Sequence, residues 1–220
     1  MRSQKPIYNP PYDSPLEDDL AYHITKYLDP TISLVPQYEV KTICGTFRID
    51  FMAEASGVKI GFECDGKDFH DESRDEWRDA MILGSKGVDA IYRMRGADLY
   101  YHINDILYFI SKWDPELFSQ RGLLNLEVLA SDAVRTSSEE YTKCVAFIRY
   151  QDDDYQVPID ITVRKLFIDI NGGRRFLETA YDFACSIGGG NLDYVIGKYQ
   201  ARNKDGKPDW DSGDSGKLCK

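Results

Sequence analysis

Two short segments of alternating polarity, residues 47–51 and 58–65, constrain the fold of this chain more than any other part of the sequence. In both, apolar side chains take every second position, the pattern of a strand with one buried face. The apolar face predicted for the first segment consists of Phe47, Ile49 and Phe51. Asp50 stands on the opposite face of that segment, as Glu63 and Asp65 do in the second. We therefore expect Glu63 and Asp65 to lie together, with Asp50 beside them if the strands pair.

This acidic face predicts a metal site. Carboxylates on adjacent strands repel one another unless a cation neutralises them. Mg²⁺ prefers oxygen ligands, and Asp50, Glu63 and Asp65 supply them. A bound divalent cation polarises a phosphate and generates hydroxide, so the predicted site indicates hydrolysis.

Composition sets wider limits. The chain has 220 residues, 42% of them hydrophobic, enough for one large domain or two small ones. We find no apolar run long enough to cross a bilayer and no signal-peptide core near the start, so we expect no membrane partner. The five cysteines are scattered and form no C-x-x-C pair, which favours a reducing, cytoplasmic setting.

The net charge bears on partners. Its formal value of −10 argues against a general electrostatic attraction to nucleic acid, because phosphate binding favours a basic face. A local basic strip is compatible with this charge, and acids around a metal add to the negative count. We expect any engagement of nucleic acid to rely on a local patch, on a homodimer or on a partner protein.

Residues 14–113 predict a compact α/β domain in the order α-β-β-β-α-β-α. The first helix begins at Ser14-Pro15, with serine as N-cap and proline in the first turn, and ends at Asp29-Pro30. The predicted strands cover residues 33–40, 46–54, 58–65 and 88–94, and the later helices cover residues 71–84 and 97–112.

The helix predicted over 71–84 is amphipathic. Its apolar side consists of Trp77, Ala80, Met81 and Leu83. Arg74 and Arg78 fall on one face with acids between them, and we expect that face to be a salt-bridged surface in solvent.

The remaining segments give weaker signals. Residues 1–13 predict a flexible arm, and residues 203–220 a disordered tail. Residues 114–140 predict a helical linker, with a helix over 116–133. Residues 141–202 predict a small α+β or helical accessory domain. Within it we expect a strand over 143–150, a strand or a helix over 159–170, and helices over 174–187 and 191–201.

The order of elements and three motifs resemble the PD-(D/E)xK, or restriction-endonuclease-like, nuclease superfamily. The motifs are S-P-L-E in the first helix, R-I-D-F in the second strand and F-E-C-D-G-K-D-F-H after it. The nearest branch resembles the very-short-patch-repair endonucleases, the related homing endonucleases and bacterial proteins with an E-x-D-G-x-x-H motif. The resemblance covers residues 14–112 and implies a restriction-endonuclease-like core.

The resemblance also implies roles for individual residues. Asp50 matches the first acid, Glu63 the second, and Glu17 the acid that the first helix contributes in many members. Asp65 stands where the motif lysine is usual. Lys67 has the strand parity to substitute for that lysine, and His70 matches the histidine of the branch, as a general acid or base.

The implied metal ligands are Asp50 and Glu63, helped by Asp65 or Glu17, around Mg²⁺ or Mn²⁺. Gln37 resembles a glutamine common in the branch and is expected near the site. Arg93 and Arg95, which close the fourth strand, are candidate phosphate contacts, with an ion-pairing role as the alternative.

These observations predict a metal-dependent endonuclease, with DNA as the substrate by resemblance. One alternative keeps the fold without the chemistry, as a catalytically inactive binding or assembly module. The absent motif lysine and the net charge favour that alternative, while the retained acids Asp50, Glu63 and Asp65 oppose it. The other alternative is an RNA-directed nuclease, which the sequence does not separate from a DNA-directed one.

Overall fold

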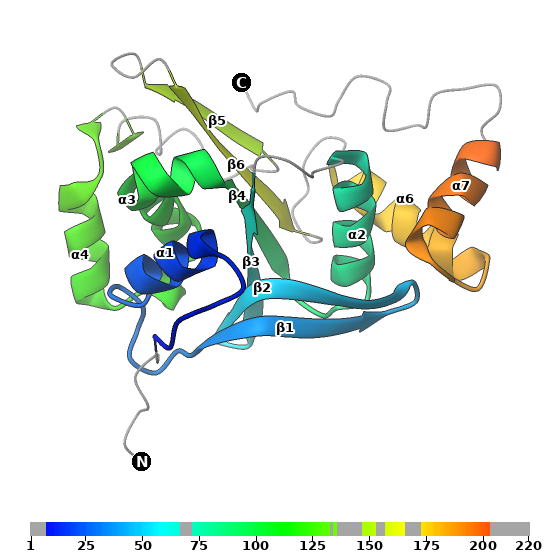
Figure 1. The fold of residues 1–220 in the computed structure, drawn as a ribbon, viewed down its shortest axis with the longest axis horizontal. Helices are drawn as coiled ribbons and strands as arrows, with labels where there is room; N and C mark the ends of the chain where they lie inside the picture. Colours follow the sequence, from blue (N-terminus) through cyan, green and yellow to red (C-terminus); the bar gives the residue numbers. More distant parts are fainter. Residues whose placement is uncertain are drawn as a thin grey trace.

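A six-stranded mixed sheet in the order β1-β2-β3-β4-β6-β5 forms the centre of the computed structural model (Figure 1). The structure describes residues 8–66, 72–132, 134–135, 147–152, 157–165 and 173–202. The strands are β1 (Leu34–Thr42), β2 (Gly45–Ala55), β3 (Val58–Asp65), β4 (Ala90–Arg95), β5 (Phe147–Asp152) and β6 (Val157–Lys165). Among the strands that the structure describes, only β3 and β4 pair in parallel, and α2 is the crossover helix between them.

Helices cover both faces of the sheet. They are α1 (Pro15–Ile24), α2 (Glu72–Gly84), α3 (Gly96–Trp113), the 3₁₀ turn η1 (Pro115–Leu117), α4 (Gln120–Leu129), α6 (Gly173–Ser186) and α7 (Leu192–Arg202). Figure 1 shows α1, α3 and α4 on one side and α2, α6 and α7 on the other. Each layer buries its own hydrophobic cluster against the sheet, which we call the first core (α1, α3, α4) and the second core (α2, α6, α7).

The sequence patterns explain most of these elements. Ser14 caps α1 as predicted, because its Oγ accepts a hydrogen bond from the backbone N–H of Glu17 at 3.2 Å. The apolar side predicted for α2 is confirmed, since Trp77, Ala80, Met81 and Leu83 are buried in the second core. None of the helices that the structure describes is long and apolar enough to span a bilayer.

The structure revises two predictions in the second half of the chain. The single helix expected over 116–133 is instead η1 followed by α4, because Ser119 caps a new helix through its Oγ. The ambiguous segment 159–170 is a strand up to Lys165, where β6 ends, and its remaining residues lie outside those described.

The segment predicted as an accessory domain shares the sheet and the second core. β6 pairs with β4, and the buried side chains of α6 pack in the same cluster as those of α2. The predicted domain boundary itself stays a prediction. The predicted tail 203–220 and the first part of the predicted arm, residues 1–7, lie outside the described residues.

The β1–β2 hairpin does not keep one apolar face. Phe47 and Ile49 pack in the second core, whereas Phe51 packs in the first core, so the predicted common face of these three residues is wrong. The change of face coincides with Gln37 on β1, whose backbone φ of 51° is in the left-handed region. Pro36 pairs with Phe51 and Tyr38 with Ile49, which places Gln37 and Asp50 opposite each other at the point where the hairpin changes face.

Candidate functional site

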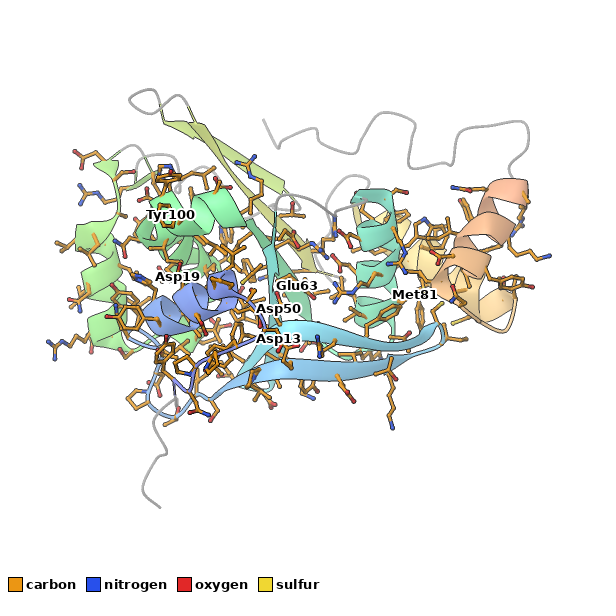
Figure 2. The ribbon with its side chains drawn as sticks, in the orientation of Figure 1. Asp13, Asp19, Asp50, Glu63, Met81 and Tyr100 are labelled. Carbon is orange, nitrogen blue, oxygen red and sulfur yellow. The ribbon has the colours of Figure 1, made fainter. Side chains whose placement is uncertain are left out.

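Asp50 and Glu63 lie beside each other where β2 and β3 pass between α1 and α2 (Figure 2). The regular pairing of β2 with β3 runs as far as Phe51 and Phe62. One position further on, the Oδ2 atom of Asp50 accepts a hydrogen bond from the backbone N–H of Cys64 at 2.8 Å. The Asp50 side chain therefore continues the contact between the two strands, and this bond fixes the orientation of its carboxylate.

Glu63 is 6% exposed and is bound by an arginine of α2. Its Oε1 accepts a hydrogen bond from Nη2 of Arg78 at 2.7 Å, and the same nitrogen donates to the backbone carbonyl of Arg48 at 2.5 Å. Burial raises the pKa of Glu63 to about 8, although the positive charges of Arg78 and Arg93 act to lower it. Burial likewise raises the pKa of Asp50 above its usual value.

Glu17 and Gln37 form a second polar contact next to these acids. Nε2 of Gln37 donates to Oε2 of Glu17 at 2.7 Å, and Oγ of Ser14 donates to Oε1 of Glu17 at 3.0 Å. Burial raises the pKa of Glu17, and the negative charge of Asp50 raises it further, so the two carboxyls interact electrostatically. The first-helix acid predicted from the sequence therefore lies near the strand acids.

Gln37 has two unusual features. Its Oε1 atom is buried and accepts no hydrogen bond from the residues that the structure describes. Its left-handed backbone conformation costs on the order of 1–3 kcal/mol for a residue other than glycine. A buried amide oxygen without a donor and a strained backbone at one residue are typical of a position that serves a ligand rather than stability.

Asp65 takes part in a second set of contacts on the same face of the sheet, which is linked to Glu63 because Nη1 of Arg78 lies 3.8 Å from Oδ1 of Asp79. Arg93 of β4 donates to both of its carboxylate oxygens, at 2.8 and 3.0 Å. The same guanidinium contacts Asp75 and Asp79 of α2, each at 3.1 Å. Arg164 of β6 also binds Asp79, which is fully buried. Around the buried Arg93 and Asp79, these side chains form an ion network that joins α2 to three strands, and we call it the buried ion network: Asp65, Asp75, Asp79, Arg93 and Arg164.

The two candidate phosphate contacts both have partners within the chain. Arg93 is only 6% exposed and makes the contacts just described. Arg95 is more exposed and binds the buried carboxylate of Asp98 at 2.8 and 3.1 Å. The ion-pairing alternative is therefore what the structure contains for each of them. Lys67 and His70 lie outside the described residues.

The structure therefore brings Asp50, Glu63, Glu17 and Gln37 together and turns Asp65 toward Arg93. Within the described ranges, no group of three or more His, Cys, Asp or Glu residues is arranged to hold a metal ion. The available donors do suit Mg²⁺ or Mn²⁺ chemically, because all of them are oxygens. The buried Oε1 of Gln37 and the raised pKa values of Asp50 and Glu63 are consistent with a cation beside them.

Sequence reasoning missed the role of α2. Arg78 was expected in solvent, but its side chain is 14% exposed and bound to Glu63, so that prediction is wrong. Arg74, by contrast, is half exposed and pairs with Asp193, as a solvent-facing residue would. One signal could have revealed the network: an arginine at position 93 in the middle of an apolar central strand requires buried carboxylate partners.

Comparisons of the chain with protein-family models, with curated proteins and with solved structures find no match.

Proposed function

We propose that this chain is a metal-dependent endonuclease that hydrolyses phosphodiester bonds of DNA. One observation carries the proposal: Asp50 and Glu63 have pKa values raised by burial, and Gln37, opposite Asp50, holds a buried oxygen with no donor among the described residues. A cation would lower both pKa values and give that oxygen a partner.

The element order supports the same proposal. The chain runs through α1, three antiparallel strands, α2, β4 parallel to β3, and α3. This is the order that the resemblance to the PD-(D/E)xK superfamily implies, with the two motif acids on β2 and β3. The restriction-endonuclease-like core is part of the proposal.

In the proposed site, Asp50 and Glu63 are the main metal ligands, with Glu17, Asp65 and the Gln37 oxygen as the further oxygen donors. When bound, Mg²⁺ or Mn²⁺ would polarise the scissile phosphate and acidify water. The protein's part is to hold the carboxylates still, and the Cys64 N–H does this for Asp50.

Other residues would act on water and on substrate. Lys67 and His70 remain the proposed groups that orient water or move a proton. We keep Arg95 as a proposed phosphate contact, because its side chain is 44% exposed. The buried Arg93 is better suited to positioning Asp65 than to meeting a phosphate.

A catalytically inactive binding or assembly module is the second candidate, and a specific observation favours it. Arginines already neutralise Glu63 and Asp65, so these acids have partners without a metal. The distinction between the two candidates is therefore whether the site takes up a divalent cation.

The test compares wild-type protein with Asp50→Asn and Asp19→Asn. Asparagine keeps the shape of Asp50 and an acceptor for Cys64, while Asp19 is an exposed acid of α1 and controls for the lost charge. We expect Mg²⁺- or Mn²⁺-dependent cleavage of supercoiled plasmid by wild-type protein and by Asp19→Asn, and none by Asp50→Asn. Cleavage of RNA but not of DNA would assign an RNA-directed nuclease.

Calorimetry on the same samples separates inactivity from the absence of a site. Metal binding that depends on Asp50, without cleavage, would point to a missing partner protein or target sequence. A folded wild-type protein that binds neither Mg²⁺ nor Mn²⁺ would refute the metal-dependent proposal and leave the binding module.

The proposal includes a setting and partners. We place the protein in a reducing, cytoplasmic environment, which the free thiols of Cys44, Cys64 and Cys185 support. Because the net charge is −10, we propose that nucleic acid is engaged through a local patch, a homodimer or a partner protein.

A further inference from the structure

Arg78 binds the carboxylate of Glu63, which the proposed metal site needs as a ligand. Its Nη2 lies 2.7 Å from Oε1 of Glu63, and the Glu63 side chain has 8% exposure to solvent. The contact is made from α2, whereas Glu63 lies on β3 and the second acceptor of Arg78, the carbonyl of Arg48, lies on β2. Arg78 thus bridges the two strands that carry Asp50 and Glu63.

A guanidinium cannot give up its proton in a protein, so Arg78 cannot replace the missing motif lysine as a base. What it brings to the site is a permanent positive charge in direct contact with a proposed metal ligand. A divalent cation that binds Glu63 meets this charge at short range, in a buried environment where water screens it weakly.

We propose that the Arg78–Glu63 pair regulates the site by competing with the divalent cation for Glu63. This inference rests on the proposed function, because it assumes that Glu63 is a metal ligand. Arg78 holds Glu63 in the resting protein, and a metal ion takes up the carboxylate when Arg78 moves away from it. Binding of the metal and release of Arg78 are then linked, and each affects the other by the same factor.

The competition explains why the acids of the proposed metal site are not arranged around a metal position in this structure. The described residues present no ready group of three metal-binding side chains, although Asp50, Glu63 and Asp65 lie on neighbouring strands. Arginines bind the last two of these acids, Glu63 through Arg78 and Asp65 through Arg93. In this state Glu63 and Asp65 contact guanidinium groups and do not converge on a shared metal position.

The test measures Mn²⁺ affinity by calorimetry, without any activity assay. Arg78→Gln removes the competing charge, and we expect it to bind Mn²⁺ roughly 10–100-fold more tightly than wild-type protein, the size of effect that neighbours of metal ligands have on affinity. Arg74→Gln is the matched control. It removes the same charge one turn earlier on α2, from an exposed pair with Asp193, and should bind as wild-type protein does.

Each result has one meaning. Equal affinities in wild-type protein and Arg78→Gln, or weaker binding in the variant, would overturn the competition and leave the proposed metal site standing. Binding by neither protein would refute the metal site itself, and the competition with it. Tighter binding that disappears when Asp50→Asn is added to Arg78→Gln would support both.

A measurement on wild-type protein covers the case in which Arg78→Gln does not fold. Arginine side-chain resonances in NMR report the loss of an ion pair directly. Saturation with Mn²⁺ broadens nearby signals, so diamagnetic Mg²⁺ is used: we expect the Nε–H resonance of Arg78 to shift on addition of Mg²⁺ and that of Arg74 to stay in place. An unchanged Arg78 resonance in metal-saturated protein would overturn the competition.

Discussion

Replacement of Arg93 by methionine tests whether the buried ion network holds the fold together. The guanidinium of Arg93 contacts three carboxylates, Asp65, Asp75 and Asp79, at 2.8, 3.1 and 3.1 Å. Methionine matches the aliphatic part of the arginine side chain but lacks the guanidinium group, so it leaves these acids with less compensation.

The magnitude follows from burial. Arg93 is 6% exposed and Asp79 is 0% exposed, so the contact is screened little by water. Removing one partner of a buried ion pair costs about 3–5 kcal/mol, because the other charge stays buried without compensation. Arg164 still binds Asp79, which places the expected loss for Arg93→Met near the lower end of that range.

Urea unfolding of wild-type protein, Arg93→Met and Arg48→Met measures the effect. Arg48 pairs with Asp13, and the two side chains are 57% and 54% exposed, so the control should lose no more than about 1 kcal/mol. In a thermal scan, a loss of about 3–5 kcal/mol lowers the Tm by roughly 6–20 °C for a chain of this size.

A loss in Arg93→Met no larger than that in Arg48→Met would refute the reasoning, because it would mean that the acids do not depend on Arg93. A second variant checks the cause. Arg93→Met combined with Asp65→Asn removes one of the acids that lost its partner, so the double variant should recover part of the stability lost in Arg93→Met.

Three further substitutions probe local contacts by the same urea assay. Ser14→Ala removes the cap of α1 and should cost about 0.5–2 kcal/mol, and recovery in Ser14→Asp but not Ser14→Val would identify capping as the cause. A Cβ at Gly122 would lie 2.2 Å from the carbonyl oxygen of Tyr27, so Gly122→Ala should destabilise by about 1–3 kcal/mol although alanine favours helix; a gain in stability would contradict this. Lys165→Met takes an ion pair at 2.8 Å from the buried Asp114 and should cost about 1.5–3 kcal/mol, and an unchanged midpoint would show that Asp114 does not need the lysine.

The local elements were predictable because their signals are local. The capped start of α1 at Ser14-Pro15 and the alternating strands β2 and β3 need only neighbouring residues to be recognised. The order of elements up to α3 followed from these signals and from simple connection rules.

The change of face in β2 was not predictable from alternation. Strict alternation assumes a regular strand, but Ile49 and Phe51 pack in different cores. The change coincides with the left-handed backbone of Gln37 on another strand, and residues 47–51 alone contain no sign of it.

The positions of the strand acids Asp50, Glu63 and Asp65 were predictable from the sequence, but their contacts were not. Asp50 and Glu63 lie together as expected, since strand parity and pairing are enough to place them. That Asp65 turns to Arg93 and Glu63 to Arg78 depends on how α2 packs against β3 and β4. Such packing brings together residues far apart in sequence, whereas helical spacing alone places Arg78 with Arg74 on one charged face.

The change of face at Gln37 and Asp50 also explains how the hairpin can carry a polar site between two apolar cores. On one side of this point the odd-numbered positions of β2, Phe47 and Ile49, pack in the second core, and on the other side Phe51, Ala53 and Ala55 pack in the first. At the boundary between the two cores, Gln37 on β1 and Asp50 on β2 pack in neither of them. A carboxylate and an amide can stand there without displacing an apolar side chain, so changes at these two positions are constrained by chemistry and backbone shape, and hardly at all by packing.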